Sequence, residues 1–304
     1  MSGPSRSIRK AVLPVAGLGT RVLPATKAVP KEMLPVFDRP AIQYVIDEAL
    51  GAGIEHIVFV TGRNKSAIED YFDRAYELED TLRQKGKTDL LEELDAILPA
   101  PGSVSFVRQQ APNGLGHAVW CARDVIGDEP FALLLPDMIM LPDRGAKQCL
   151  SGMMDAYARE GGNVIGVNAV APDLAHLYGI VATGEAKALG FEISGMVEKP
   201  PKGTAPSNLY INGRSSLQPE IFGILKTQER GTGGEIQITD GMRKLMNIQP
   251  FHGVEFEGRV YDCGDKIGYL RATAALALAN AQFSEEALAA LKDEIAIAAL
   301  KAAQ

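Results

Sequence analysis

The feature that most constrains this chain of 304 residues is an alternation of apolar runs with helical patterns along its first half. The apolar runs are rich in Val, Leu, Ile and Phe, which predicts buried strands at 10–16, 57–60, 104–107 and 131–135. Helical spacing or a high charge content predicts helices at 41–50, 65–98 and 118–124. Strands that alternate with helices predict an α/β fold with a doubly wound, mostly parallel, Rossmann-like sheet.

The second half follows this alternation less regularly. Short segments punctuated by glycine at 179–197 predict hairpins, and therefore a small antiparallel excursion from the sheet. The remaining expected elements are helices at 146–158, 217–225, 235–246 and 267–283, a strand at 163–170 and strand pieces at 251–261. We expect one domain over 1–280. The Ala- and Leu-rich tail at 281–304 predicts a C-terminal helical arm, which either packs against another subunit or lies on its own core.

Charge and cysteine content exclude several classes of function. A formal net charge of −7 argues against a nucleic-acid partner, because phosphate backbones are held by clustered Lys and Arg. Cys121, Cys149 and Cys263 are odd in number and have no C-x-x-C spacing, so neither a disulfide framework nor a zinc site is indicated. The stretch 1–10 is polar and basic and lacks the apolar h-region typical of a signal peptide, and no apolar run of about 18 residues follows. We therefore expect a cytoplasmic protein without a membrane partner.

A glycine-rich loop, Gly17-Leu-Gly-Thr-Arg21, follows the first predicted strand. Glycine lets backbone approach a phosphate closely. The third glycine and the ribose-binding acid of the dinucleotide fingerprint are missing, which disfavours a nicotinamide dehydrogenase, and the Gly-Lys-Ser/Thr of a Walker loop is absent as well. Arg21 and Lys31 instead place two cations after a central strand, an arrangement that suits a polyphosphate. From these residues alone, a surface loop with solvated cations remains an equal alternative.

Taken with Pro30-Lys31, the loop resembles the signature of the sugar-nucleotide pyrophosphorylases, the nucleoside triphosphate:sugar 1-phosphate nucleotidylyltransferases. The longer stretch 15–35 is similar to the bacterial UTP:glucose-1-phosphate uridylyltransferase branch of that family. The likeness extends in order over roughly residues 8–280, through 109–118, Leu135-Pro-Asp137, Val197-Glu-Lys-Pro200, 207–209, 234–240 and Asp262-Cys-Gly264. Several motifs in register are far more specific than any one of them.

The resemblance implies a role for each matching residue. Nucleotide binding is implied for Ala16, Gly17, Gly19, Thr20, Arg21, Gln109 and Gly114, with Gln109 and Gly114 reading the uracil edge. Sugar-phosphate binding is implied for Gly179, Glu198 and Lys199, and Mg²⁺ binding for Asp137 and Asp262. Arg21, Lys31 and Lys199 are the implied catalytic cations, since phosphoryl transfer depends chiefly on electrostatic stabilisation. His117 is a further candidate near the base, and Asn212 one near the sugar.

Structural alternatives remain for several of these residues. Asp137 could cap the turn after its strand, and Asp262 could be a turn aspartate before Gly264. Asp265 lies close enough in sequence to Asp262 to be mistaken for it. The pair Glu198–Lys199 could be an exposed ion pair at the end of a strand.

The implied reaction is in-line attack of glucose 1-phosphate on the α-phosphorus of UTP, which gives UDP-glucose and pyrophosphate with the assistance of Mg²⁺. The resemblance also implies a homodimer or homotetramer. One alternative is a dTTP-dependent enzyme, or one that uses another sugar 1-phosphate, on the same scaffold. Another is a non-catalytic homologue that only binds sugar nucleotides, although retention of the cations and carboxylates argues against it.

Overall fold

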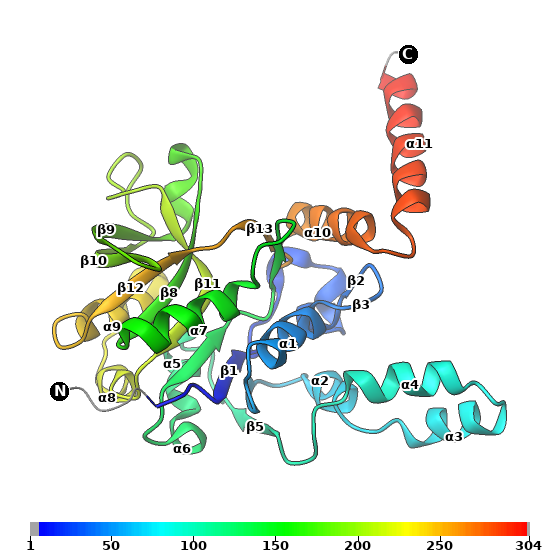
Figure 1. Ribbon diagram of the computed structural model, residues 1–304, viewed down its shortest axis with the longest axis horizontal. Coiled ribbons are helices and arrows are strands. Elements are labelled where there is room, and N and C mark those ends of the chain that lie inside the picture. Colours follow the sequence, from blue (N-terminus) through cyan, green and yellow to red (C-terminus); the bar gives the residue numbers. More distant parts are fainter. Residues whose placement is uncertain (1–5, 303–304) are drawn as a thin grey trace.

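The computed structural model describes residues 6–302, in which a central sheet has helices on both faces (Figure 1). The strands are β1 (Lys10–Pro14), β2 (Pro35–Val36), β3 (Arg39–Pro40), β4 (His56–Thr61), β5 (Val104–Arg108), β6 (Phe131–Leu134), β7 (Met138–Pro142), β8 (Asn163–Ala169), β9 (Gly179–Lys187), β10 (Gly190–Glu198), β11 (Leu209–Leu217), β12 (Phe251–Glu255) and β13 (Gly258–Asp262).

The α-helices are α1 (Ala41–Gly51), α2 (Ser66–Tyr71), α3 (Tyr76–Gln84), α4 (Thr88–Ile97), α5 (Leu115–Cys121), α6 (Arg123–Ile126), α7 (Cys149–Glu160), α8 (Ile221–Lys226), α9 (Ile238–Leu245), α10 (Lys266–Ala279) and α11 (Ser284–Ala302). Short 3₁₀ helices are η1 (Thr20–Val22), η2 (Ala25–Lys27), η3 (Lys31–Met33), η4 (Pro172–Leu177) and η5 (Thr232–Gly234). The charged region predicted as helical at 65–98 is thus three separate helices.

The main sheet has nine strands in the order β5-β4-β1-β6-β11-β8-β12-β10-β9. From β5 to β6 every pairing is parallel, with Val12 opposite Val58 on one side and Leu133 on the other. This half confirms the predicted alternation of strands and helices, because each parallel step needs a crossover connection. Its carboxyl edge is where the loop after β1, the loop after β5 and the turn after β6 emerge.

The prediction of a mostly parallel sheet with one small antiparallel excursion is wrong for the other half. The expected hairpin is present as β9 and β10, but β11 also runs antiparallel to both of its neighbours, β6 and β8. The sequence predicts a helix from 217, whereas Leu217 is the last residue of β11 and α8 begins at Ile221. The fold is therefore α/β with a mixed sheet.

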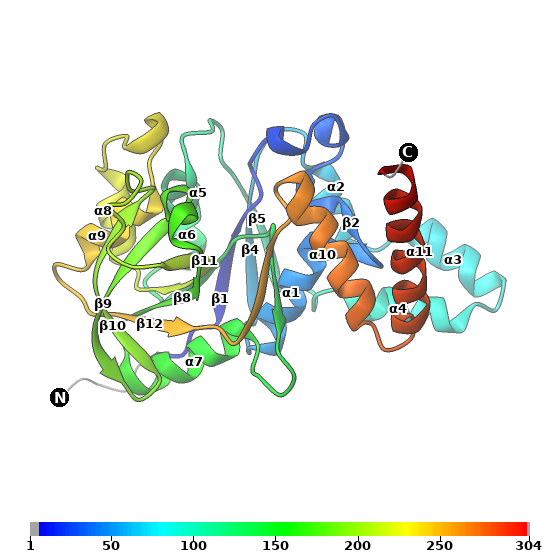
Figure 2. The ribbon, with the colours of Figure 1, turned by 90° about the horizontal axis from the view of Figure 1, so that it is seen from above.

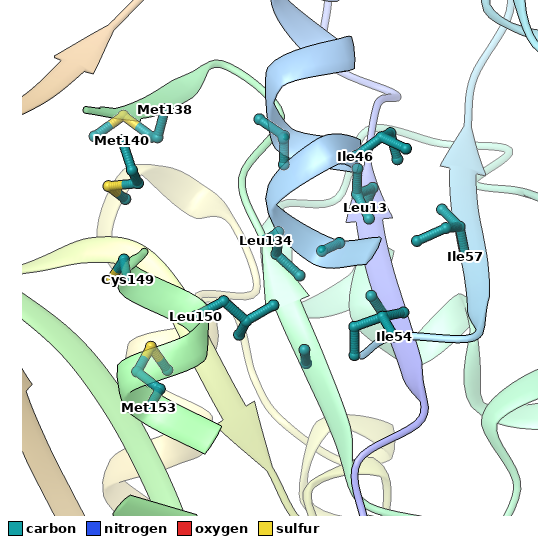
Figure 3. Packing of buried hydrophobic residues seen from close by; sticks show 14 of the residues in the cluster. Leu13, Ile46, Ile54, Ile57, Leu134, Met138, Met140, Cys149, Leu150 and Met153 are labelled. Atoms are coloured by element: carbon teal, nitrogen blue, oxygen red, sulfur yellow. The ribbon is translucent and has the colours of Figure 1, made fainter. Parts of the chain in front are cut away.

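Alternate residues of the central strand β1 feed two hydrophobic cores on opposite faces of the sheet. Leu13 packs in the core with α1 and α7, and Val12 packs in the core with α5, α8 and α9. Figure 3 shows the first core, where Leu13, Leu134 and Ile57 from neighbouring strands meet Ile46 of α1. Alternation of side chains between faces explains why both faces of a central strand are apolar.

A separate two-stranded sheet, formed by distant parts of the chain, lies beside the main sheet. β7 and β13 pair antiparallel, so that Asp262 lies opposite Met138. A third, smaller core joins this two-stranded sheet to α10 through Ile139, Tyr261 and Ala272. These contacts place the end of β13 beside the carboxyl end of β6.

The C-terminal helix α11 follows α10 and projects away from the sheet (Figures 1 and 2). In both views it lies at the same end of the molecule as α3 and α4, opposite the end occupied by β9 and β10. The division into 1–280 and 281–304 stays a prediction, and residues 1–5 and 303–304 of those ranges lie outside the described residues. Between residues 6 and 302, no helix combines the length and apolar character needed to cross a bilayer.

Candidate active site

The glycine-rich loop connects β1 to η1 and η3 with its backbone close to other side chains. Gly19 has φ of 66°, and a Cβ atom built there would lie 3.2 Å from Cβ of Lys31 and 3.3 Å from Cβ of Thr26. Thr26 Oγ1 donates to the Gly19 carbonyl at 2.7 Å. The positive φ and the close neighbours explain why glycine occupies this position. Thr20 and Arg21 then form the start of η1.

Two aspartates meet beyond this loop, although they are far apart in sequence. Asp137 lies in the turn between β6 and β7, and Asp262 is the last residue of β13. The Cys263 amide donates to the Asp137 carbonyl at 2.7 Å, and the Gly264 amide donates to Asp262 Oδ1 at 2.7 Å. A Cβ atom at Gly264 would lie 2.6 Å from Asp137 Oδ2 and 2.8 Å from Asp262 Oδ1. Both carboxylates therefore converge on one glycine.

Each carboxylate has a cation from the glycine-loop region as its partner. Lys31 Nζ lies 2.5 Å from Asp137 Oδ2, and Arg21 Nη1 lies 3.2 Å from Asp262 Oδ2. The Lys31–Asp137 pair is largely buried, whereas the Arg21 side chain is 60% exposed. The structure thus gathers the four predicted charged residues of the phosphate and metal sites into one cluster.

The environment shifts the pKa values of the two aspartates in opposite directions. Burial by itself raises the pKa of Asp137, but the Lys31 ammonium, together with backbone hydrogen bonding and Arg21, holds that pKa below its usual value. Burial, followed by the charge of Asp137, raises the pKa of Asp262. Burial would lower the pKa of Lys31, but Asp137 and Glu32 together raise it above the ordinary value. Asp137 and Lys31 are therefore a charged pair at neutral pH.

The residues around Gly264 fit a small, hard divalent cation. Two carboxylates offer oxygen ligands to the same space, and that space is a cradle which a Cβ atom at Gly264 would fill. Mg²⁺ typically takes one or two protein carboxylates and completes its shell with water and substrate phosphates. Within residues 6–302, no group of three or more His, Cys, Asp and Glu forms a metal site on protein ligands alone. Asp137 and Asp262 could therefore hold Mg²⁺ only together with other oxygen ligands.

A second cluster lies at the end of β5. Gln109 Nε2 donates to the Gly114 carbonyl at 3.0 Å and lies 3.0 Å from His117 Nδ1. Gly114 has φ of 106°, and a Cβ atom there would lie 2.8 Å from both the nitrogen and the oxygen of Ile236. The Ile236 amide donates to the Asn113 carbonyl at 2.8 Å, so the 113–116 loop is held against the segment before α9. Gln109, Gly114 and His117, which are predicted to lie near the base, do lie together.

A third cluster lies where β9 and β10, the last two strands at one edge of the main sheet, pair with each other. Gly179 at the start of β9 pairs with Glu198 at the end of β10, and a Cβ atom at Gly179 would lie 3.1 Å from Glu198 Oε2. Thr239 Oγ1 donates to the same carboxylate oxygen at 2.7 Å. Lys199 follows with φ of 46°, which lysine rarely adopts, and its amide donates to the Tyr178 carbonyl at 3.0 Å.

The third cluster neighbours the aspartates. The rings of Tyr178 and Tyr210 lie 4.7 Å apart. Burial, and after it the nearby charge of Asp262, raises the pKa of Tyr178. Asn212 is fully buried instead, where its Nδ2 donates to Asn168 Oδ1 at 2.9 Å, so its amide faces the core rather than the cluster.

Several residues that shape these clusters are not identified by the sequence analysis. Thr239 lies inside the quoted motif 234–240, but no position in that motif is assigned a contact with Glu198. Glu32, next to Lys31, is buried and paired with Lys65 at 2.8 Å, and this pair fixes η3. The only sequence signal for the Glu32–Lys65 pair is the position of Glu32 beside Lys31.

Comparison with known proteins gives a consistent family. The nucleotidyl transferase model matches residues 10–278. The chain is 49% identical over 282 residues to a UTP–glucose-1-phosphate uridylyltransferase of Bacillus subtilis (strain 168), covering 92% of this chain and 95% of the relative. A UTP-bound UGPase from Acinetobacter baumannii superposes with a TM-score of 0.85 at 45% identity, over 95% of this chain and 98% of the other. A UDP-glucose pyrophosphorylase complexed with UDP-glucose has a TM-score of 0.80 at 39% identity, over 88% of this chain and 98% of the other.

Proposed function

Because this chain belongs to the nucleotidyl transferase family, we propose that its three clusters form one active site for joining UTP to glucose 1-phosphate, with release of pyrophosphate. Relatives of known name at 45–49% identity carry this activity or bind UTP, and they match nearly the full length of the chain. The enzyme class and the two substrates follow from them. The roles of individual residues are inferred from the geometry.

One observation carries the assignment of the reacting centre: Lys31–Asp137 and Arg21–Asp262 converge on Gly264 at the carboxyl edge of the sheet. Nucleotidyl transfer needs little covalent chemistry from the protein, and stabilisation of the phosphate charge is its main requirement. The two carboxylates hold the two cations in place beside the glycine loop. When the triphosphate binds, Arg21 and Lys31 turn from these carboxylates toward its oxygens.

The nucleotide lies along the edge from the glycine loop to the end of β5. Ala16, Gly17, Gly19 and Thr20 offer backbone to the phosphates, since small residues permit close approach. Gln109 presents a carboxamide to the uracil edge, which offers both donors and acceptors. Its present hydrogen bond to the Gly114 carbonyl fixes the side chain in that orientation.

Glucose 1-phosphate occupies the third cluster. Glu198 accepts hydrogen bonds from sugar hydroxyls, and Thr239 orients it through the bond to Oε2. Gly179 leaves room beside the carboxylate for the sugar ring. Lys199 pairs with the sugar phosphate, which is already ionised near neutral pH and attacks without a protein nucleophile. Alignment of the two phosphates then accounts for the rate.

Mg²⁺ is the proposed cofactor, held by Asp137 and Asp262. A bound Mg²⁺ neutralises phosphate charge and helps to orient the triphosphate. The role of this chain is to present two carboxylates in one cradle, with Asp137 kept ionised by Lys31 until the triphosphate binds. We further propose that the chain assembles as a homodimer or homotetramer, with α11 in the contact.

A substrate screen tests the function directly. Pyrophosphate release is measured with UTP and with dTTP, each against the 1-phosphates of glucose, galactose and mannose, at saturating Mg²⁺. The expected result is the highest kcat/KM for UTP with glucose 1-phosphate. A clear preference for dTTP or for another sugar would assign the chain to a different specificity on the same scaffold. Activity with none of the six pairs would instead support a protein that only binds sugar nucleotides.

A further inference from the structure

Behind the turn that carries Asp137 lies a fully buried arginine. Arg214 is on β11, directly opposite Leu134 at the end of β6. Its side chain and that of Glu48 on α1 are 0% and 4% exposed. Arg214 Nε and Nη2 donate to Glu48 Oε2 at 3.1 Å and 2.8 Å. A charge this deep needs a partner of opposite sign, and Glu48 supplies it.

The other hydrogen bonds of the guanidinium go to backbone carbonyls around the aspartate turn. Nη2 donates to Met138 O at 2.7 Å, and Nη1 donates to Leu135 O at 3.2 Å and to Gly213 O at 3.3 Å. Leu135 and Met138 are the residues on either side of Pro136–Asp137. The planar fork therefore fixes the carbonyls on both sides of the turn from which the carboxylate of Asp137 projects.

Glu48 anchors this fork to the helical layer. Its second oxygen, Oε1, accepts the Leu150 amide at 3.0 Å, which ties α1 to the start of α7. Figure 3 shows Leu150 and Leu134 in the same apolar core, around the helix that carries Ile46. Well-packed apolar residues often match or exceed a buried ion pair in stability. The geometry of the turn is therefore a better explanation for Arg214 than stability alone.

We propose that Arg214, held by Glu48, is a positioning residue that sets the affinity for the metal ion by fixing the turn of Asp137. The inference rests on the proposed function, in which Asp137 and Asp262 hold Mg²⁺. The Met138 carbonyl that Arg214 binds belongs to the residue opposite Asp262 in the β7–β13 pair. Fixing Met138 thus fixes the spacing between both carboxylates. Groups that orient metal ligands typically change metal affinity by about 10- to 100-fold.

Two variants test whether the geometry of the Asp137 turn, rather than the buried charge or the stability of the fold, sets the metal affinity. Arg214→Lys keeps a cation opposite Glu48, but an ammonium has three donors and no planar fork, so it cannot reproduce the bonds to all three carbonyls. Glu48→Gln keeps the shape of the anchor and removes its charge. Lys10→Met is the matched control, because Lys10 Nζ also donates to two carbonyls, of Val125 and Ile126, but from the end of β1 remote from the glycine loop.

The readout is Mn²⁺ binding in the presence of UTP, followed by electron paramagnetic resonance, with the melting temperature of the ligand-free protein measured in parallel. We expect Mn²⁺ affinity to fall about 10- to 100-fold in Arg214→Lys and Glu48→Gln. Lys10→Met should bind Mn²⁺ like the unmodified chain. Unchanged affinity in both site variants, or an equal loss in Lys10→Met, would overturn the inference. If the unmodified chain with UTP binds no Mn²⁺, the proposed metal site itself fails.

Discussion

At the scale of single residues, Lys199 combines an unfavourable backbone conformation with an exposed charge. Its φ of 46° is rare for a residue with a Cβ atom, and such conformations tend to occur at functional sites. The bond from its amide to Tyr178 and the β9–β10 pairing hold it there. Its ammonium lies 3.9 Å from Glu198, so it is not fully used by an internal partner. This leaves the charge available to a sugar phosphate.

We therefore predict that Lys199→Ala raises the KM for glucose 1-phosphate about 10- to 100-fold, the cost of one lost hydrogen bond between charged groups. The KM for UTP should change little, because Lys199 lies in the cluster assigned to the sugar. Initial rates of pyrophosphate release with each substrate varied in turn measure both constants. Lys202→Ala, an exposed lysine nearby, is the control. Equal effects of the two variants on glucose 1-phosphate would contradict the assignment.

Residue types and motifs predict the charged positions of the site, but not how they meet. Asp137 and Asp262 are identified by resemblance, yet their proximity depends on the pairing of β7 with β13, which no local pattern indicates. Arg214 gives even less signal, because an arginine in sequence is expected at the surface. Its burial depends on Glu48 and on carbonyls from the turn after β6, from β7 and from β11. Such a network exists only once the sheet has formed.

At the scale of elements, β11 shows where sequence patterns fail. The strand contains Asn212-Gly213, a strong turn signal, and the charged Arg214, so it lacks the apolar run or alternation that predicts a strand. The structure accommodates this with a register shift between Ile211 and Ser215. The parallel half is predicted well because β1, β4 and β6 are buried on both faces and are largely apolar.

The contact between the 113–116 loop and the segment before α9 supports a second prediction. Gly114→Ala would place a Cβ atom 2.8 Å from backbone atoms of Ile236, so the two segments must move apart. We expect the KM for UTP to rise at least about 10-fold, since even 1.4 kcal/mol of lost binding has that effect. Titration of UTP in the pyrophosphate-release assay measures this constant.

Gly127→Ala is the matched control for the Gly114 variant. Gly127 also has a positive φ, 69°, but a Cβ atom there has no neighbour within 4 Å. Both variants thus carry backbone strain, whereas only Gly114→Ala disturbs the contact with Ile236. A similar KM for UTP in both variants would mean that the contact does not support the base site.

At the scale of the whole molecule, His252 should make stability depend on pH. It is buried on β12, and neither ring nitrogen has a hydrogen-bond partner among the described residues. Burial lowers its pKa; Lys187 lowers it further, whereas Glu160 and Glu192 oppose the shift. Below about pH 6.5 the unfolded chain takes up a proton that the folded protein excludes, so the free energy of unfolding falls as pH falls.

Urea unfolding at pH 7.5 and pH 5.5 tests this linkage. His252→Gln should lose less stability between the two values than the unmodified chain does, by up to about 1.4 kcal/mol for each pH unit in the window. The sign follows because glutamine binds no proton in either state. The same pH dependence in both proteins would show that His252 does not contribute.

The helix α11 supports the last prediction, which concerns assembly. Its 19 residues project from the sheet, and Leu288, Ile295 and Leu300 remain 44%, 69% and 69% exposed. Leu288 and Ile295 are seven residues apart and therefore share a face. Most helical stability in proteins comes from packing an apolar face, so the exposed apolar side chains of α11 call for a partner surface. A second copy of the chain is the partner that a homo-oligomer would supply.

A chain truncated after Phe283 should therefore keep its fold, and light scattering should give it the mass of one subunit. The full chain should have a mass that is a multiple of 32.5 kDa. Ile295→Lys should weaken the assembly in the same direction, because it places a charge on the exposed apolar face. Glu294→Lys is the control, since it changes a neighbouring polar position by a larger charge. A single-subunit mass for the full chain would remove α11 from any self-contact. An unchanged multiple after truncation would move the contact to another surface.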